Sequence, residues 1–297
     1  MPAYDLCLAW NWEYDRDFAR LLEAACTRLG LSLLQAQPET VAGLLQELQA
    51  GTTCIATLLD RASDSDPSFQ PLVDWARTQP LRRINPQEQA HWAWDKATMH
   101  LEFFTHSVHT PYTQLLAPYL EQPQPVPPDL SPLGGSFAIK PATLGGGQGV
   151  QLEASTWEQV QAARQQYPAE KYLLQAHVTP AALDGRPAWF RVLYCDGAVY
   201  PHWWDPQTHA YRPVTAQEKA SLGLQPLRRM AAQIAQVCRL DLFSTEIART
   251  DGGDFLAVDY VNDPVDLRLQ SAAADGVPDA IVENIAARLV RLAARPA

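Results

Sequence analysis

The sequence predicts a mixed fold of α/β and α+β class, in which a small parallel α/β unit precedes a larger α+β part. Three features lead to this prediction. Strand-like and helix-like stretches alternate over about the first 85 residues, six prolines fall within the fifteen residues 118–132, and a strand–turn–strand pattern spans residues 242–260. With 297 residues, the chain is long enough for two or three structural units with buried cores.

The N-terminal unit is predicted from alternating strands and helices. Apolar stretches at Leu6–Trp10, 31–35 and 53–59 are typical of strands, and helical patterns at Arg16–Leu29 and 39–49 lie between them. Strands separated by helices at these distances favour a parallel sheet. We therefore expect a parallel α/β domain over residues 1–85.

The next helix has a clear start, because Asn85 can cap it and Pro86 suits its first position. Apolar residues then recur at alternating spacings of four and three, which predicts one continuous helix with a single buried stripe. The residues of this stripe are Ala90, Trp94, Ala97, Leu101 and Phe104.

The proline-rich segment 118–132 excludes a helix or a central strand, because proline has no backbone N–H to donate. We expect a linker there. The α+β elements predicted beyond it are strands at Phe137–Pro141, 149–152, 172–178, Trp189–Cys195 and Ala198–Trp204, and helices at 156–166, 227–238 and from about residue 278.

Charge and composition exclude several classes of function. The net charge is −10, from 33 acidic and 23 basic residues, and no cluster of lysine and arginine indicates a nucleic-acid partner. No apolar run reaches the ~18 residues of a membrane span, and the N-terminus lacks a signal-peptide pattern. The five cysteines are widely spread, so we expect reduced thiols in a cytoplasmic protein.

A glycine loop after a predicted strand is the strongest chemical signal. The strand delivers Lys140, and residues 145–149 then hold four glycines in five positions. Glycines let backbone N–H groups approach an anion closely, and a lysine ammonium is a compact partner for phosphate. The spacing differs from a P-loop, in which the lysine follows the glycines. The residues alone also fit a flexible hairpin loop beside a surface lysine.

Two carboxylates face one another in the predicted C-terminal hairpin. The turn at residues 250–253 brings Glu246 about opposite Asp259, with Cβ atoms ~5 Å apart if the residues pair directly. Facing carboxylates on an apolar sheet repel unless a cation lies between them, and a hard cation with oxygen ligands suits this arrangement. The alternative is that one of the two side chains points to solvent.

From about Asn85 onward, four segments in order resemble the ATP-grasp superfamily, which includes D-alanine–D-alanine ligase, glutathione synthetase and glutamate-adding ligases. The segments are Asp95-Lys96, Ile139-Lys140-Pro141 with the glycine loop, residues 173–178, and Glu246 with Asp259 and Asn262. The resemblance implies an N-terminal pre-ATP-grasp domain at 1–85 and a two-lobed ATP-grasp domain at 86–297, with a mobile lid at about 134–178.

The resemblance also implies roles for individual residues. The expected ATP-binding residues are Lys96, Lys140, Gly145, Gly146, Gly147, Gln148, Gly149 and the adenine-contacting strand Gln175, Ala176, His177 and Val178. The expected Mg²⁺ ligands are Glu246, Asp259 and Asn262. Arg191 and Lys140 are the expected catalytic groups at the terminal phosphates.

The chain departs from the family pattern in places. Trp189 stands where an acid is usual, and residues 263–268 replace a loop that often carries proline and glycine. Strict strand alternation also puts Asp259 and Asn262 on opposite faces. Either a bulge near Tyr260 brings both inward, or Asp263 replaces one of them.

We therefore expect an ATP- and Mg-dependent ligase that activates a small-molecule or peptide carboxylate as an acyl phosphate and couples it to an amine. A small-molecule kinase of the same fold and a non-catalytic nucleotide-binding regulatory module are the alternatives. The aromatic segment from His202 to Asp205 is a candidate substrate wall, or alternatively packs in a core. Neither a nucleic-acid nor a membrane partner is expected, and a homodimer is possible.

Overall fold

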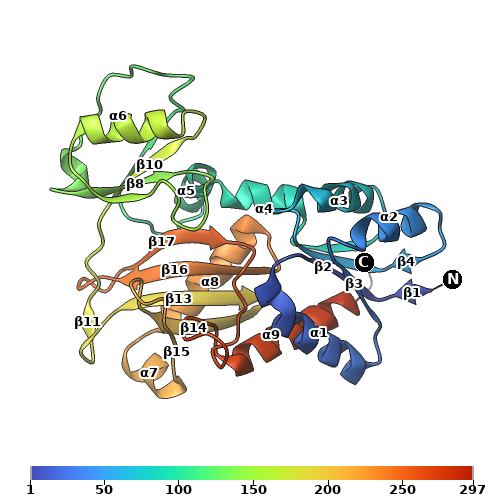
Figure 1. Ribbon diagram of the computed structural model, residues 1–297. Helices are drawn as coiled ribbons and strands as arrows, with labels where there is room; N and C mark the ends of the chain where they lie inside the picture. Colours follow the sequence, from blue (N-terminus) through green and yellow to red (C-terminus); the bar gives the residue numbers. More distant parts are fainter. Residues whose placement is uncertain (1, 296–297) are drawn as a thin grey trace.

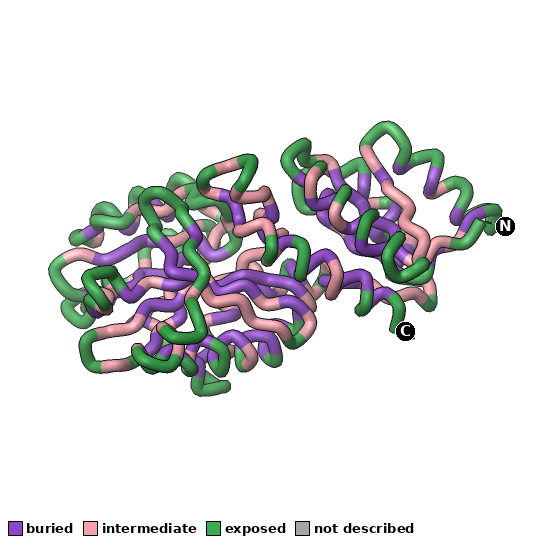
Figure 2. The backbone as a smooth tube through the Cα atoms, turned by 90° about the horizontal axis from the view of Figure 1, so that it is seen from below, coloured by how far each residue is buried: buried purple, intermediate pink, exposed green. Residues whose placement is uncertain are grey.

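The computed structural model describes residues 2–295. Three sheets organise the described chain (Figure 1): an N-terminal parallel sheet, a small antiparallel sheet and a large antiparallel sheet. Buried residues run along the strands in the middle of the molecule, and exposed residues concentrate on loops and outer helix turns (Figure 2). The mixed class predicted from the sequence is therefore correct.

The N-terminal sheet has the order β3-β2-β5-β6, and all of its pairings are parallel. Its strands are β2 (Leu6–Trp10), β3 (Leu33–Ala36), β5 (Thr57–Arg61) and β6 (Arg82–Ile84). The connecting helices are α1 (Arg16–Leu29), α2 (Val41–Gln49) and α3 (Gln70–Arg77), and two short strands, β1 (Ala3–Tyr4) and β4 (Cys54–Ile55), pair beside them. Because β2 is buried at every residue, its sequence is continuously apolar rather than alternating.

The last helix of the chain, α9 (Asp279–Ala293), packs beside α1 (Figure 1). Leu289 and Ile285 share a buried cluster with Phe18 and Leu22 of α1. The core of the N-terminal unit therefore includes a helix from the other end of the chain.

The large sheet has the order β15-β14-β13-β16-β17 and is antiparallel throughout. Its strands are β13 (Trp189–Cys195), β14 (Ala198–Trp204), β15 (Tyr211–Pro213), β16 (Leu242–Arg249) and β17 (Phe255–Asn262). Helix α8 (Gln225–Cys238) packs on it through a shared apolar core. The short elements β11 (Ala182–Leu183), β12 (Arg186–Pro187) and α7 (Ala216–Ser221) lie around this sheet.

The small sheet has the order β7-β10-β8-β9 and its own core against helix α6 (Trp157–Gln166). Its strands are β7 (Thr113–Leu116), β8 (Phe137–Pro141), β9 (Gln151–Ala154) and β10 (Tyr172–Ala176). The sequence missed β7, which lies before the proline-rich segment and pairs with β10. This sheet and α6 project from the rest of the molecule (Figure 1).

The proline-rich segment is tied to α6 instead of running free as a linker. The buried Arg164 guanidinium donates to the carbonyl oxygens of Ala117, Pro118 and Gln122. Because proline has no N–H, this segment offers carbonyls that no strand partner uses, and an arginine satisfies them.

The prediction of one continuous helix over residues 85–104 is wrong. Asp95 has extended backbone angles and divides it into α4 (Gln87–Trp94) and α5 (Lys96–Thr105), and its carboxylate caps α5 by accepting from the N–H groups of Ala97 and Thr98. The break resets the helical register. As a result, Leu101 and Phe104 are 57% and 81% exposed instead of buried.

Asn85 also has a different role from the predicted helix cap. It is buried with a φ of 49°, and Pro86 takes the cap position of α4. The Asn85 amide oxygen accepts from the N–H groups of Asp241 and Leu242, and its nitrogen donates to Leu242 O and Asp263 Oδ1. The end of the N-terminal sheet is thereby bound to the start of β16.

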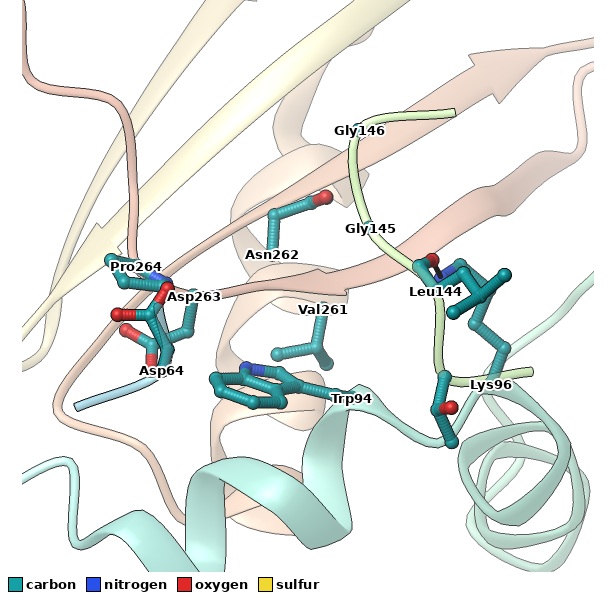
Figure 3. A pocket seen from close by; sticks show the side chains of 11 residues that line it. Asp64, Trp94, Lys96, Leu144, Gly145, Gly146, Val261, Asn262, Asp263 and Pro264 are labelled. Carbon is teal, nitrogen blue, oxygen red and sulfur yellow. Dashed lines mark hydrogen bonds between the residues drawn. The ribbon is translucent and has the colours of Figure 1, made fainter. Parts of the chain in front are cut away.

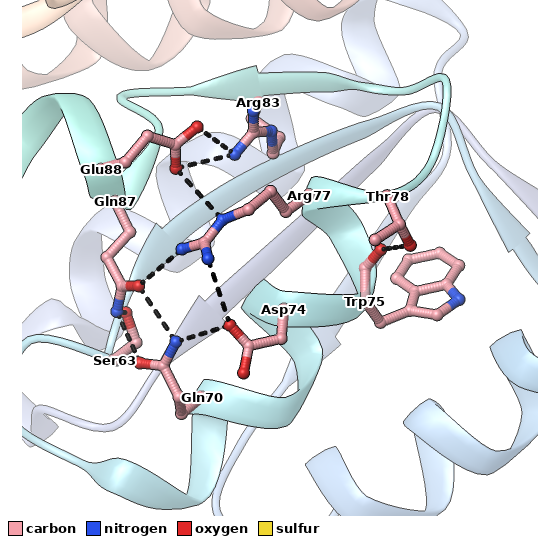
Figure 4. Close-up of polar contacts among 9 residues, drawn as sticks. All are labelled: Ser63, Gln70, Asp74, Trp75, Arg77, Thr78, Arg83, Gln87 and Glu88. Carbon is pink, nitrogen blue, oxygen red and sulfur yellow. Dashed lines mark hydrogen bonds and ion pairs between the residues drawn. The ribbon is translucent and has the colours of Figure 1, made fainter.

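A polar network fixes the entry into α4 (Figure 4). Glu88 forms ion pairs with Arg77 of α3 and with Arg83 of β6, and Gln87 exchanges hydrogen bonds with Gln70. These contacts set the direction in which the chain leaves the N-terminal unit.

We predict that Asn85→Ala destabilises the protein by about 2 to 4 kcal/mol, because it leaves buried backbone groups and Asp263 without partners. Urea unfolding measures this loss. Asn284→Ala is the matched control, since Asn284 is exposed and its amide donates only to Ala280 O of its own helix. Equal midpoints for the two variants would contradict the assigned role.

Candidate functional site

A cavity of about 520 Å³ lies between the small sheet and the large sheet. Most of the residues singled out from the sequence line it. They are Lys96, Lys140, Gly145, Gly146, Gly147, Gln175, Ala176, His177, Val178, Glu246, Asp259 and Asn262. Residues from α5, β8, β10, β16 and β17 therefore meet in one place.

Lys140 bridges the two sheets. From β8, its Nζ donates to Gln175 Oε1 at 2.7 Å and to the Val258 carbonyl of β17 at 3.1 Å. Burial lowers the pKa of the Lys140 ammonium, and the carboxylates of Asp259 and Glu246 offset part of that effect. The cavity thus holds a partly buried lysine whose charged form burial disfavours.

The hydrogen bonds of Gln175 continue from Lys140 into the core. Gln175 Nε2 donates to the Tyr260 hydroxyl at 3.2 Å, and that hydroxyl also lies 2.8 Å from His100 Nδ1. The neutral amide at the end of β10 therefore orients Lys140 without neutralising it. Ala176, His177 and Val178 follow along the cavity wall.

The glycine loop reaches the cavity with three of its four glycines. Gly146 and Gly147 have φ values of 59° and 75°, in the left-handed region that favours glycine. Lys96 Nζ donates to the Leu144 carbonyl at 3.0 Å, at the beginning of this loop. Lys96 therefore joins α5 to the loop.

Gln148 and Gly149 lie outside the cavity lining. A Cβ at Gly149 would come within 2.8 Å of Tyr167 and 2.9 Å of Pro141, so this position requires glycine for a close approach. Gln148 Nε2 donates to the Tyr167 hydroxyl at 3.4 Å. The structure thus places both residues where they shape the loop.

Glu246 and Asp259 are direct cross-strand partners, as the hairpin spacing predicted. Between the pairs Glu246–Asp259 and Ser244–Asn262, β17 has one more residue than β16. This bulge lets Asp259 and Asn262 both line the cavity, while Tyr260 packs in the core against Phe103. The sequence left open either a bulge near Tyr260 or the replacement of one of the two cavity-lining residues by Asp263, and the structure contains the bulge.

The two carboxyl groups have opposite electrostatic environments. Burial raises the pKa of Glu246, although Arg191 opposes this. Burial also disfavours the charged form of Asp259, but the charges of Lys96 and Lys140 outweigh it and hold the pKa of Asp259 below its usual value. Asp259 is therefore the carboxylate kept ionised by the lysines.

Arg191 lies behind Glu246 and outside the cavity lining. Its Nη1 donates to Glu246 Oε1 at 2.8 Å, and its Nη2 donates to Ser244 Oγ at 3.1 Å. The guanidinium also stacks over Trp204, 5.0 Å from the ring centre. The His202–Asp205 segment thus supports Arg191 through Trp204, and His202 itself is fully buried.

A second cavity of about 360 Å³ adjoins the first and shares Lys96, Gly145, Gly146 and Asn262 with it. Asp64 and Asp263 lie at the end opposite Lys96, with Trp94 and Val261 in between (Figure 3). Asp263 belongs to this cavity, and not to the one that holds Glu246 and Asp259.

The sequence reasoning missed Asp64, Trp94 and Trp189 as site residues. Asp64 follows the carboxyl end of β5, an edge where parallel sheets commonly bind ligands. Trp189 lies two residues before Arg191 on the same face of β13, so the position of Arg191 already indicated it.

The residues present fit a hard divalent cation. Two carboxylates and one amide oxygen, from Glu246, Asp259 and Asn262, give an all-oxygen donor set of the kind that Mg²⁺ prefers. Among residues 2–295, no group of three or more His, Cys, Asp or Glu side chains is arranged to hold a metal ion.

Within the same range no helix has the length and apolar character to cross a membrane.

Comparisons with known proteins identify the architecture. No family model and no curated protein matches the chain. Among solved structures, an ATP-grasp RimK domain protein from Sphaerobacter thermophilus DSM 20745 superposes with a TM-score of 0.63 at 17% identity, over 96% of this chain and 98% of that one. This chain has the ATP-grasp fold.

Two further structures with the ATP-grasp fold match nearly the whole chain. D-alanine–D-alanine ligase from Bacillus anthracis, complexed with ATP, has a TM-score of 0.64 at 11% identity and covers 99% of both chains. The ATP-grasp ligase PsnB, complexed with minimal precursor, Mg and ADP, has a TM-score of 0.65 at 11% identity, over 98% of this chain and 99% of that one.

We predict that Arg191→Met destabilises the protein by about 3 to 5 kcal/mol, because it leaves the Glu246 carboxylate buried without its ion pair. The side chains of this pair are 17% and 14% exposed. Arg212→Met is the matched control, because Arg212 is 45% exposed in its pair with Glu218 and its loss should cost less than about 1 kcal/mol. Urea unfolding compares the two, and a similar loss in both would contradict the prediction.

Proposed function

We propose that this protein is an ATP- and Mg-dependent ligase that activates a carboxylate as an acyl phosphate and couples it to an amine. The observation that carries the proposal is the first cavity, where Lys96, Lys140 and the glycine loop face Glu246, Asp259 and Asn262. The lysine cations and the glycine-loop backbone suit a triphosphate, and the oxygen ligands suit its metal.

In this proposal the cavity is divided along its length. Gln175, Ala176, His177 and Val178 bind the adenine end, and Lys140 with the loop binds the phosphates. The small sheet acts as the lid, residues 1–85 form the pre-ATP-grasp domain, and residues 86–297 form the ATP-grasp domain. The position of β8 and the glycine loop on the projecting sheet supports the assignment of the lid.

Glu246, Asp259 and Asn262 would hold the Mg²⁺. When bound, the metal supplies charge neutralisation for the phosphate oxygens. Lys96 and Lys140 contribute positive charge beside the phosphate site, where burial strengthens the action of such charges on a developing anion. Arg191 contributes by holding Glu246, the carboxylate to which it donates.

The second cavity favours a reaction with a second substrate over nucleotide binding alone. It opens from the phosphate end of the first cavity, next to Lys96, Gly145 and Asn262. A second substrate there would reach the terminal phosphate directly. Proteins of the same fold include a ligase named for D-alanine and a ligase complexed with a precursor peptide, so a small molecule or a peptide fits the proposal.

We expect Lys140→Met to weaken ATP binding by about 10- to 100-fold, or about 1.4 to 2.8 kcal/mol, because it removes a charge-assisted contact to phosphate. Isothermal titration with a non-hydrolysable ATP analogue and Mg²⁺ measures the affinity. Lys219→Met is the control, because Lys219 lies on α7, outside both cavities. Unchanged affinity in Lys140→Met would refute the assignment.

We also expect metal-dependent turnover with a defined set of products. A screen of carboxylates with amines should give ADP, free phosphate and an amide, and EDTA should abolish the reaction. Asp259→Asn should reduce turnover about 100-fold or more at equal Mg²⁺, while Asp254→Asn, in the exposed turn of the same hairpin, should not.

The products also discriminate between the alternatives. A stable phosphorylated product in place of an amide would show a kinase. Binding of the non-hydrolysable analogue, together with no ADP formation from ATP in the screen, would show a regulatory module. Either result would refute the ligase proposal.

A further inference from the structure

Trp189 lines the first cavity, and the proposed function leaves it without a role. Its indole Nε1 donates to Glu246 Oε2 at 3.0 Å, while Arg191 donates to the other oxygen, Oε1, at 2.8 Å. Both oxygens of this carboxylate are therefore engaged by donors from the same face of one strand, β13.

The strand register explains how a tryptophan two residues away reaches Glu246. Arg191 pairs directly with Glu246, whereas Trp189 pairs with Ala248. From this register position the indole N–H extends along β16 to Glu246. The contact is therefore a diagonal one across the strand pair, within reach of a long aromatic side chain.

Two donors from β13 restrict the orientation of the Glu246 carboxylate, and neither of them contacts Asp259. A carboxylate oxygen has two acceptor positions, and one on each oxygen of Glu246 is already used. Rotation of the group would break a hydrogen bond to a partly buried arginine or tryptophan. Asp259, across the strand pair, has a side-chain hydrogen bond with Asn262, but among the described contacts it forms no ion pair with an arginine and receives no tryptophan N–H.

We propose that Trp189 is a positioning residue that fixes the orientation of the Glu246 carboxylate, so that the metal meets a ligand already held in place. The inference rests on the proposed function, since it assumes that Glu246 is a metal ligand. Groups that hydrogen-bond to metal ligands orient them before the metal binds, and their loss typically lowers metal affinity by about 10- to 100-fold.

The test uses Mn²⁺ as the probe and the full-length protein with saturating ADP. Free Mn²⁺ is counted by electron paramagnetic resonance in titrations with and without the protein at the same ADP concentration. The difference corrects for Mn²⁺ chelated by free ADP and gives the Mn²⁺ affinity of the protein without any turnover. Trp189→Phe keeps an aromatic ring and removes the N–H donor. We expect it to weaken Mn²⁺ binding about 10-fold, and to leave ADP affinity in EDTA unchanged.

The matched control is Trp75→Phe, which removes an indole N–H from α3, away from both cavities. It should leave the Mn²⁺ affinity unchanged. If Trp189→Phe fails to fold, benzothienylalanine at position 189 keeps the bicyclic shape, lacks the N–H, and gives the same measurement.

The outcomes separate this inference from the proposed function. If the unmodified protein binds Mn²⁺ with ADP and the position-189 variant binds it equally well, the inference is overturned and the proposed function stands. If the unmodified protein binds no Mn²⁺ in the presence of ADP, both are overturned. Weaker ADP binding in EDTA would also overturn the inference, because Trp189 would then act on the nucleotide itself.

Discussion

The bulge in β17 is the constraint on which the site depends. Three steps along β17, from Asp259 to Asn262, match two steps along β16, from Glu246 to Ser244. An unbroken ladder would turn Asn262 to the same face as Tyr260, because side chains alternate strictly along a strand. The extra residue instead keeps both polar side chains at the cavity, while Tyr260 packs in the apolar core.

Charge balance in the cavity follows from that geometry. Arg191 compensates Glu246 from behind, so the lysines are left to stabilise the ionised form of Asp259. Lys140 is itself held by Gln175 and by the Val258 carbonyl, neither of which carries charge. Among the described residues, no ion pair therefore holds the Lys140 ammonium directly, and burial strengthens the interaction of this charge with its neighbours.

The relation between the two cavities is set by contacts far apart in the sequence. The Asn85 amide binds the end of β6 to the start of β16, and it also donates to Asp263. Asp95 interrupts the helix that follows, which places Lys96 at the beginning of α5 with its amine on the glycine loop. Asp64 of the N-terminal unit consequently lies across a cavity from Lys96.

The sequence by itself determined the local features: the mixed class, the parallel orientation of the first strands, the glycine loop after Lys140, and the pairing of Glu246 opposite Asp259. These follow from short-range rules of hydrophobic period and turn length. Only the tertiary structure decided the bulge at Tyr260, the break at Asp95, the pairing of β7 with β10 and the contact from Trp189 to Glu246. Each of these depends on packing between segments distant in the chain, where burial of apolar surface and pairing of buried polar groups outweigh local preference.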